Sequence, residues 1–283
     1  MNQSEYILSD DQLMDVAPSI FASEPWGEVS DRYTFIPTIG VVNALRNEGF
    51  FPVKASQSRT RIDGKGMFTK HMLRFRREQD LNMPRVVEGN AHHFYKIPPE
   101  IPELVLVNSH DRSSGYQLNG GIWRKICSNG LMVQSSYMGS ISVRHSGNIA
   151  DEVIEGSYSI IKEMPKILSK IDSLKAIILD PKQQEIYANA ALELRYPKDD
   201  AGNNRSPIKA PQLLAARRDA DKAPDLWTTF NRVQENFMKG GLKGIATTGR
   251  RTRTRKIGSV NEDLRLNKAL WTLTEQMEEY MSK

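Results

Sequence analysis

The sequence predicts an α+β fold, with a meandering antiparallel sheet in the N-terminal half and helices in the C-terminal half. Before residue 147, short apolar runs alternate with Gly- and Asn-rich turns, a pattern typical of strands. After residue 147, apolar residues recur at helical spacing over long segments. These patterns predict four regions: a sheet domain at 1–147, a helical region packed on it at 148–241, a basic mobile tract at 242–258 and a C-terminal helix at 259–283.

Two helices are expected before most of the sheet. Ser9 and Gln12 form a capping-box pattern ahead of the first helix, and Pro37-Thr38 opens the second, which Gly49 ends. The strands expected after them are a basic hairpin at 54–77, a buried strand at 103–108, two strands at 116–118 and 122–126 joined by an Asn119-Gly120-Gly121 turn, and short strands at 131–133 and 141–143.

Helical periodicity organises the second half of the chain. The expected helices run from Asn148 to Ile178 with a kink at Pro165, from 180 to 195, around 212–219, from 225 to a Gly240-Gly241 stop, and from a capping box at Ser259 onward.

The hairpin at 54–77 carries far more positive charge than its surroundings. It holds eight basic residues and one acid, a net of +7 in a chain whose total is +5. A three-residue Gly64-Lys65-Gly66 loop pairs Lys54 with Arg76 and gives one apolar face and one outward basic face. A two-residue Asp63-Gly64 turn instead mixes the faces. We prefer the first register. The alternative to a binding surface is a polar face that is only solvated, because half-exposed strands often carry such residues.

A second basic stretch, 239–258, has seven basic residues and no acid, so the rest of the chain is acidic. Basic charge sorted in this way indicates a polyanion partner, because arginine binds phosphate through paired donors. A solvated linker without a partner is the alternative. The predicted nucleic-acid-binding residues are Lys54, Arg59, Arg61, Lys70, Arg74, Arg76, Arg77, Arg124, Lys125, Arg250, Arg251, Arg253, Arg255 and Lys256.

No catalytic residue, metal site or cofactor is predicted. The single cysteine, Cys127, excludes an internal disulfide and fits a reducing compartment. The sequence has no phosphate-binding GxxxxGK[ST] motif, no secretory signal and no apolar run long enough to span a membrane. His110 and Asp111 together suggest a metal-dependent nuclease as an alternative, so enzyme activity stays open.

Seven segments carry a family resemblance: PTIGVVNALRNEGFFPVKASQSRTR, FTKHMLRFRR, LVLVNSHDRSSGYQL, GIWRKICSNGLMV, VRHSG, LWTTFNRVQENFMKGG and VNEDLRLNKALWTL. Together they resemble a phage- and plasmid-borne family, the one numbered nine-three-two among domains of unknown function. Many members read NSHDGS where this chain reads NSHDRS, so Arg112 replaces the usual glycine. The resemblance implies a mobile-element protein in the cytoplasm of a bacterial host cell, and it implies no activity.

The order of elements is also similar to that of single-strand annealing proteins of the Rad-fifty-two and RecT/Redβ type, which form rings or filaments and hold DNA in a basic groove. This similarity is one of architecture only. We therefore expect single-stranded DNA binding and annealing in recombination without nucleotide hydrolysis, with DNA favoured over RNA, a homo-oligomer, and no membrane partner. The alternative from another class is a counter-defence protein that occludes a host nuclease or immune complex.

Overall fold

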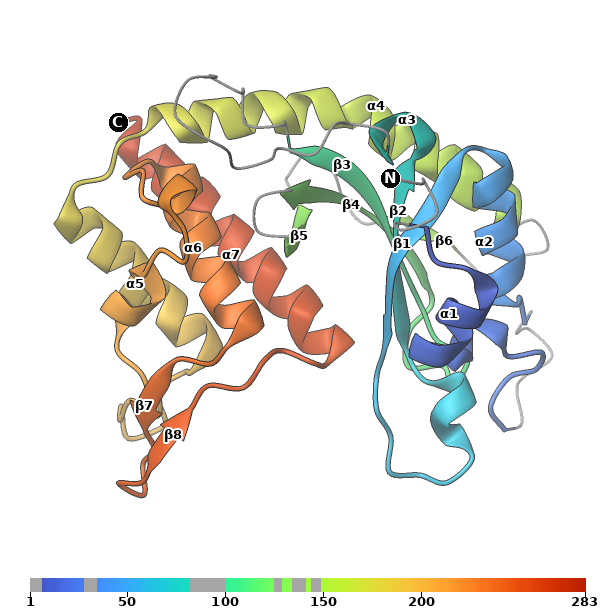
Figure 1. Cartoon of the computed structure of the whole chain (residues 1–283), viewed down its shortest axis with the longest axis horizontal. Coiled ribbons are helices and arrows are strands. Elements are labelled where there is room, and N and C mark those ends of the chain that lie inside the picture. The colour runs from blue at the N-terminus through green and yellow to red at the C-terminus, as the bar shows by residue number, and fades with distance from the viewer. Residues whose placement is uncertain (1–6, 28–34, 82–99, 125–128, 134–140, 144–148) are drawn as a thin grey trace. The chain divides into compact units, whose positions relative to one another are not determined.

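The computed structural model describes residues 7–27, 35–81, 100–124, 129–133, 141–143 and 149–283. The chain divides into two compact units, Met1–Met164 and Pro165–Lys283. The first unit contains an antiparallel sheet with helices, and the second is mainly helical (Figure 1). The predicted α+β fold is confirmed.

Three short helices precede the sheet: α1 (Asp10–Val16), the 3-10 helix η2 (Pro18–Phe21) and α2 (Thr38–Asn47). The predicted capping box is present, because the Gln12 N–H donates to Ser9 Oγ and the Ser9 N–H donates to Gln12 Oε1. Gly49 follows α2 with a φ of 78°, a left-handed conformation that favours glycine after a helix.

The sheet of the first unit consists of β1 (Phe50–Gln57), β2 (His71–Arg77), β3 (Ile101–Asn108), β4 (Tyr116–Arg124), β5 (Asn129–Val133) and β6 (Ile141–Val143). Its order is β1-β2-β3-β4-β5, with β6 also paired to β4, and all pairs are antiparallel. On one face, Leu73 and Phe75 of β2 lie beside Leu104 and Leu106 of β3, and all four are fully buried. The helices α1 and α2 lie next to β1 (Figure 1).

The predicted three-residue turn of the basic hairpin is wrong. β1 ends at Gln57 and β2 begins at His71, and the connection between them contains the 3-10 helix η3 (Lys65–Phe68). Lys54 therefore pairs with Arg74 rather than with Arg76. Because the register differs from the predicted one by two residues, Lys54 keeps its place on the same face as both arginines.

The predicted turn at Asn119-Gly120-Gly121 is also wrong, since all three residues lie inside the single strand β4. Asn119 pairs with Val105 of β3, and Gly120 pairs with Leu104 of β3 on one side and with Val133 of β5 on the other. By itself a glycine pair favours a turn. Here backbone pairing with β3 on one side and β5 on the other keeps it extended.

The second unit is built around α6 (Leu226–Lys239), in which every residue from Leu226 to Phe237 is buried. Its other elements are the long α4 (Ile149–Ala176), which begins in the first unit, α5 (Pro181–Arg195), the 3-10 helices η4 (Ala210–Leu214) and η5 (Asp219–Asp221), the strands β7 (Lys243–Ile245) and β8 (Arg251–Arg253), and α7 (Val260–Met281).

Three expectations for the second unit need correction. The helix expected around 212–219 is replaced by η4 and η5. Ser259 precedes α7 but makes no side-chain capping hydrogen bond. The tract expected to be mobile contains a hairpin, because β7 and β8 pair with each other. None of the described helices is long and apolar enough to cross a lipid bilayer.

Arg112, in the loop between β3 and β4, has a φ of 66° and is the one non-glycine residue with positive φ among the described residues. The backbone of a non-glycine residue in this left-handed conformation is strained by about 1 kcal/mol. We expect Arg112→Gly to raise the free energy of unfolding by about 0.5 kcal/mol, after the larger unfolded-state entropy of glycine is subtracted. Urea unfolding checks this, with Arg112→Ala as the matched control. Equal stabilities of the two variants would contradict relief of strain.

Candidate nucleic-acid interface

The β7–β8 hairpin has two different faces. Lys243 pairs with Arg253 and Ile245 pairs with Arg251, and the pair between them is Gly244 with Thr252. Because directly opposed residues of an antiparallel pair point to the same side, the two outer pairs share one face. That outer face therefore presents three cations and one aliphatic side chain, and the other face presents only Gly244 and Thr252.

Glycine and backbone hydrogen bonds fix the hairpin against the rest of the second unit. A Cβ atom at Gly244 would overlap the Pro207 carbonyl oxygen, which also accepts a hydrogen bond from the Ile245 N–H at 2.8 Å. Gly240 has a φ of 63°, and a Cβ there would lie 2.6 Å from the carbonyl carbon of Arg255. These contacts turn the Gly244 side inward and leave the cationic side outward.

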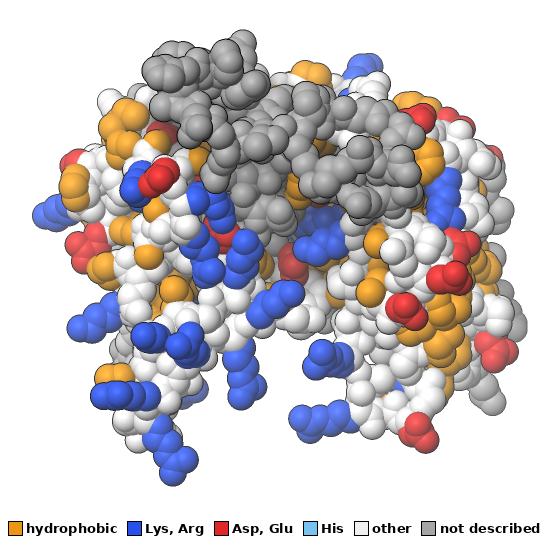
Figure 2. Space-filling view, in the orientation of Figure 1, with side chains coloured by type: hydrophobic (Ala, Val, Ile, Leu, Met, Phe, Trp, Pro, Cys, Tyr) orange, Lys and Arg blue, Asp and Glu red, His pale blue; other side chains and the backbone are white. Residues whose placement is uncertain are grey.

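Six cationic side chains of this region are exposed, and none forms an ion pair with an acid of the described residues. Figure 2 shows Lys and Arg side chains gathered over β7 and β8. Lys243 and Arg253 stand directly opposite each other, a placement that destabilises a strand pair unless an anion lies nearby. The six are Lys243, Arg250, Arg251, Arg253, Arg255 and Lys256.

An open hollow of about 720 Å³ lies on this hairpin. Its lining consists of the residues of the two strands, Lys243, Gly244, Ile245, Arg251, Thr252 and Arg253. Its described lining thus includes three cations and no acid, and this composition suits an anionic ligand such as a phosphate group.

Five of the six cations lie within the tract that the sequence predicted to bind nucleic acid, and Lys243 was missed. The signal that would have included it is the alternation of Lys243, Gly244 and Ile245, which places Lys243 two residues from an aliphatic residue on one strand face. Lys239 belongs to the same basic stretch, but its ammonium group donates to Glu235 at 2.6 Å. It is therefore already neutralised within the fold.

The β1–β2 connection offers a smaller basic surface in the first unit. Arg59 and Arg61 are exposed there, and neither forms an ion pair with a described acid. Lys65 forms an ion pair with Asp111 at 3.1 Å. Lys70 is half-buried, and burial lowers the pKa of its ammonium group while Asp111 raises it. Lys54, in β1 before this connection, is exposed.

The predicted outward placement of Arg74 and Arg76 is wrong, because both are buried. Both guanidinium groups bind the carboxylate of Glu103, at 3.0 and 2.8 Å, and Glu103 is itself buried. The Arg76 guanidinium also lies 3.7 Å from the centroid of the Trp123 ring. In the hairpin sequence alone, Arg74 and Arg76 suggest a basic surface. With Glu103 of β3 they form a buried ion-pair cluster instead.

The remaining predicted contacts lie elsewhere. Arg77 forms an ion pair with Asp80 at 3.1 Å, and Arg124 is buried. Lys125 and Cys127 lie outside the described residues. The structure thus leaves Lys54, Arg59 and Arg61 exposed in the first unit and the 250–256 cations exposed in the second.

His110 and Asp111 do not share partners that would suit a metal-dependent nuclease. The Asp111 carboxylate binds Lys65 and the Ser113 N–H. The fully buried His110 ring instead has its Nε2 atom 3.1 Å from the Thr38 hydroxyl oxygen and lies beside the Phe35 ring in a tilted arrangement. Across the described ranges, no cluster of three or more His, Cys, Asp or Glu side chains is placed to hold a metal ion.

Thr38 is instead the centre of a buried polar cluster. Its hydroxyl oxygen lies 2.9 Å from His71 Nε2, 3.1 Å from His110 Nε2 and 3.1 Å from Asn108 Nδ2. His71 Nδ1 in turn lies 2.9 Å from the Ser19 hydroxyl. These residues come from η2, α2, β2 and the β3 end, so the cluster ties the N-terminal helices to the sheet.

The burial of His71 makes the stability of the fold depend on pH. Burial and the neighbouring His110 lower the pKa of His71 to about 3. An unfolded histidine titrates near 6.5, so below that pH the unfolded chain binds a proton that the folded chain does not. The stability is therefore complete above about pH 6.5 and falls as the pH drops toward 3.

Between pH 7 and pH 5 we expect His71 alone to lower the free energy of unfolding by about 2 kcal/mol. Urea unfolding at the two pH values measures this difference, and His71→Gln should reduce it by that amount because glutamine does not titrate. A variant with the same pH dependence as the unmodified protein would show that another group is responsible.

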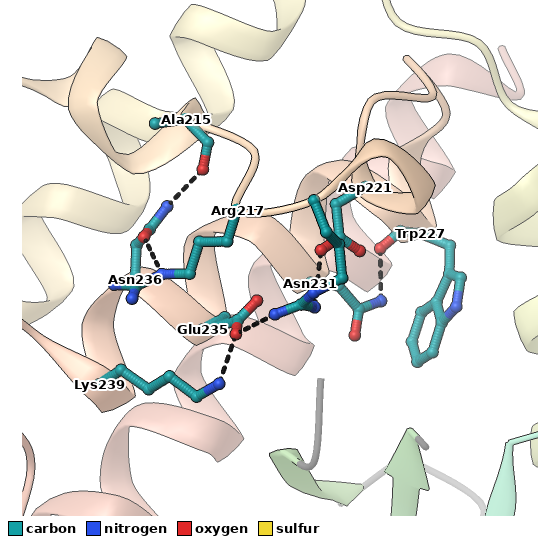
Figure 3. A network of polar contacts seen from close by, with 9 residues as sticks. Ala215, Arg217, Asp221, Trp227, Asn231, Glu235, Asn236 and Lys239 are labelled. Carbon is teal, nitrogen blue, oxygen red and sulfur yellow. Dashed lines mark hydrogen bonds and ion pairs between the residues drawn. The ribbon is translucent and has the colours of Figure 1, made fainter. Parts of the chain in front are cut away.

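A second buried polar network stabilises the unit that carries the hairpin (Figure 3). Glu235 of α6 accepts hydrogen bonds from Arg218 and Lys239 at 2.5 and 2.6 Å. Burial raises the pKa of Glu235, but Arg218 and Lys239 together lower it by more than burial raises it, so the pKa lies below its usual value. Asn236 accepts from Arg217 Nε and donates to backbone carbonyls of η4 and the residues after it. The network joins the 213–221 segment to α6.

Comparisons with known proteins give a family and no activity. The profile of the family described as Domain of unknown function (DUF932) matches residues 25–271. The UPF0380 proteins YafZ and YfjQ of Escherichia coli (strain K12) are each 37% identical to the chain over 270 residues, which covers 95% of this chain and 91% of each relative. No solved structure gives a significant match. The chain therefore belongs to the DUF932 family.

Proposed function

We propose that this protein binds single-stranded DNA through its phosphate backbone, using the outer face of β7–β8, and acts in recombination without hydrolysing a nucleotide. The observation that supports the proposal is the set of six exposed cations that form no ion pair with a described acid. Phosphates are the anions that arginine forks and lysine ammonium groups bind best at an open surface.

The opposed cations of the hairpin support binding rather than a structural role. Lys243 faces Arg253 across the strand pair, and like charges in this arrangement oppose folding. Arg74 and Arg76 show the contrast, because these arginines of the first unit are neutralised by Glu103. The cations of β7–β8, by contrast, are exposed and form no ion pair with a described acid, so they are available to an anion from outside the fold.

The spacing of the cations fits successive phosphates of a nucleic-acid strand, and the shortness of the ribbon favours a flexible strand. Arg251 and Arg253 lie two residues apart on β8, which corresponds to about 7 Å along the strand. This distance is comparable to the spacing of successive phosphates in an extended single strand. A single strand is also flexible enough to follow a short ribbon, whereas duplex phosphates are fixed in place.

Salt dependence tests the proposal. The triple variant Lys243→Gln, Arg251→Gln and Arg253→Gln removes three phosphate contacts. We expect it to reduce the slope of log affinity against log salt concentration by about 2, since each contact with a single strand contributes about 0.7. Fluorescence anisotropy with a labelled single-stranded oligonucleotide measures the slope.

The matched control is Lys182→Gln, Lys198→Gln and Lys222→Gln, which removes the same charge from exposed lysines of the same unit. This control should keep the slope of the unmodified protein. Absence of binding at low salt, or affinity that is indifferent to salt, would refute the proposed function. An equal loss in the two triple variants would refute the assignment to β7–β8.

A further inference from the structure

The cationic face of β7–β8 carries one side chain that phosphate binding does not require. Ile245 lies directly opposite Arg251, on the same face as Lys243 and Arg253, and 62% of its surface is exposed. We infer that Ile245 contacts the base faces of a bound strand and makes the hairpin prefer unpaired, unstacked bases to duplex. This inference rests on the proposed function and deepens it, because it assigns a substrate preference to one residue.

Ile245 has no role in the core that would explain it. Its side chain lies on the outer face, and the contact that fixes this strand is made by its backbone, whose N–H donates to the Pro207 carbonyl oxygen at 2.8 Å. The inward side of β7 is occupied by Gly244, against Pro207. Replacement of the Ile245 side chain therefore leaves the anchor of the hairpin in place.

The position of Ile245 within the hollow suits a nucleobase. The hollow is lined by Ile245 together with Lys243, Arg251 and Arg253, so an apolar surface lies beside groups that can bind phosphates. A nucleic-acid strand has the same alternation, with apolar base faces beside a charged backbone. Aliphatic side chains are known to contact or wedge between bases where stacking is interrupted. In a duplex such a contact first requires unstacking of a base step, which costs free energy, whereas an unpaired strand offers its base faces at a lower cost.

The same combination recurs in the first unit, and this recurrence is an independent observation. Ile62 follows Arg61 in the β1–β2 connection, and 58% of its surface is exposed. Its backbone N–H donates to Thr60 Oγ1 at 3.1 Å, so again the backbone is held and the side chain is presented. Each of the two exposed cationic surfaces thus carries one exposed isoleucine.

The experiment compares Ile245→Ala with the unmodified full chain on one short oligonucleotide that contains 2-aminopurine, offered as a single strand and as a duplex. We expect the variant to bind the single strand about five-fold more weakly, as expected for partial loss of one buried aliphatic side chain. Its affinity for the duplex and its salt slope should be unchanged. The fluorescence increase that reports unstacking of 2-aminopurine should be lost.

The matched control is Ile186→Ala, which removes an isoleucine of 55% exposure on α5, away from the hairpin strands in sequence. It should behave as the unmodified protein does. The inference is overturned if the unmodified protein binds but Ile245→Ala keeps its single-strand affinity and 2-aminopurine signal, or loses single-strand and duplex affinity equally. Failure of the unmodified protein to bind either form refutes the proposed function instead, so the two failures are distinguishable.

Discussion

Thr38→Val is expected to lower the free energy of unfolding by about 3–5 kcal/mol, although the two side chains have nearly the same shape. The Thr38 hydroxyl lies within hydrogen-bonding distance of His71 Nε2, His110 Nε2 and Asn108 Nδ2, and all three partners are fully buried. Valine removes all of these hydrogen bonds. Because the three partners are buried, solvent water does not replace the missing hydroxyl group.

The directions of these hydrogen bonds follow from the neighbours of His71. His71 Nδ1 lies 3.1 Å from the Thr69 carbonyl oxygen, which can only accept, so Nδ1 carries the proton. His71 Nε2 then accepts from the Thr38 hydroxyl. The two lone pairs of that hydroxyl are left for the N–H groups of His110 and Asn108. One hydroxyl group thus donates once and accepts twice, which is its full capacity. The Tyr116 hydroxyl also lies 3.3 Å from the Thr38 hydroxyl oxygen, but its single proton has a shorter bond, of 2.9 Å, to the Ile36 carbonyl oxygen.

Urea unfolding at pH 7 measures the loss, with Thr38→Ser as the matched control. Serine keeps the hydroxyl and removes one methyl group, so we expect it to cost about 1 kcal/mol. If Thr38→Val were no less stable than Thr38→Ser, the hydroxyl would contribute nothing and the hydrogen-bonding scheme would be wrong.

Glu103→Gln is the second substitution with a large expected effect, a loss of about 3–5 kcal/mol. The variant keeps the shape of the side chain but removes the negative charge that binds the buried Arg74 and Arg76. Removing the charge of a buried ion-pair partner is far more costly than losing a surface ion pair. Urea or thermal unfolding measures the difference.

The matched comparison is a variant in which the whole cluster is made apolar, Arg74→Met, Arg76→Met and Glu103→Leu. Buried ion pairs are often replaced by apolar residues at little cost, so this variant should be more stable than Glu103→Gln. A Glu103→Gln variant that loses less than about 1 kcal/mol would show that water or another group already screens the two arginines.

The parts of the fold that local sequence determines were predicted correctly. The α1 capping box, the glycine that ends α2, and the predicted starts of α5 near residue 180 and of α6 near residue 225 are all present. Each depends on residues within one turn of helix, so spacing alone is sufficient. The division into a sheet-rich and a helical half follows from periodicity in the same way.

The largest errors come from partners that are distant in the chain, whereas the absent Ser259 cap of α7 is a local error. Asn119-Gly120-Gly121 reads as a turn until β3 and β5 pair on its two sides. Arg74 and Arg76 read as surface cations until Glu103, from a different strand, reaches them. A local pattern gives the face on which a residue lies, but its burial depends on which strand becomes the neighbour.

The candidate site was predicted in part for the same reason. The charge count located the 250–256 tract without any knowledge of contacts, because no acid occurs nearby in the sequence. The hairpin geometry that adds Lys243 and Ile245 to this surface depends on Gly244 lying against Pro207. That contact spans 37 residues and leaves no periodic signal in the sequence.

The helix α4 has a consequence for anyone who wishes to dissect the protein. It runs unbroken from Ile149 to Ala176, and the two units divide within it, between Met164 and Pro165. Tyr158 in its first half donates to Glu48, and Lys170 in its second half binds Glu278. A cut at the boundary would leave each fragment with a truncated helix and an uncovered apolar stripe. The boundary between the two units therefore lies in a helix and not in a loop, so neither truncation nor proteolysis at that boundary would release an intact half.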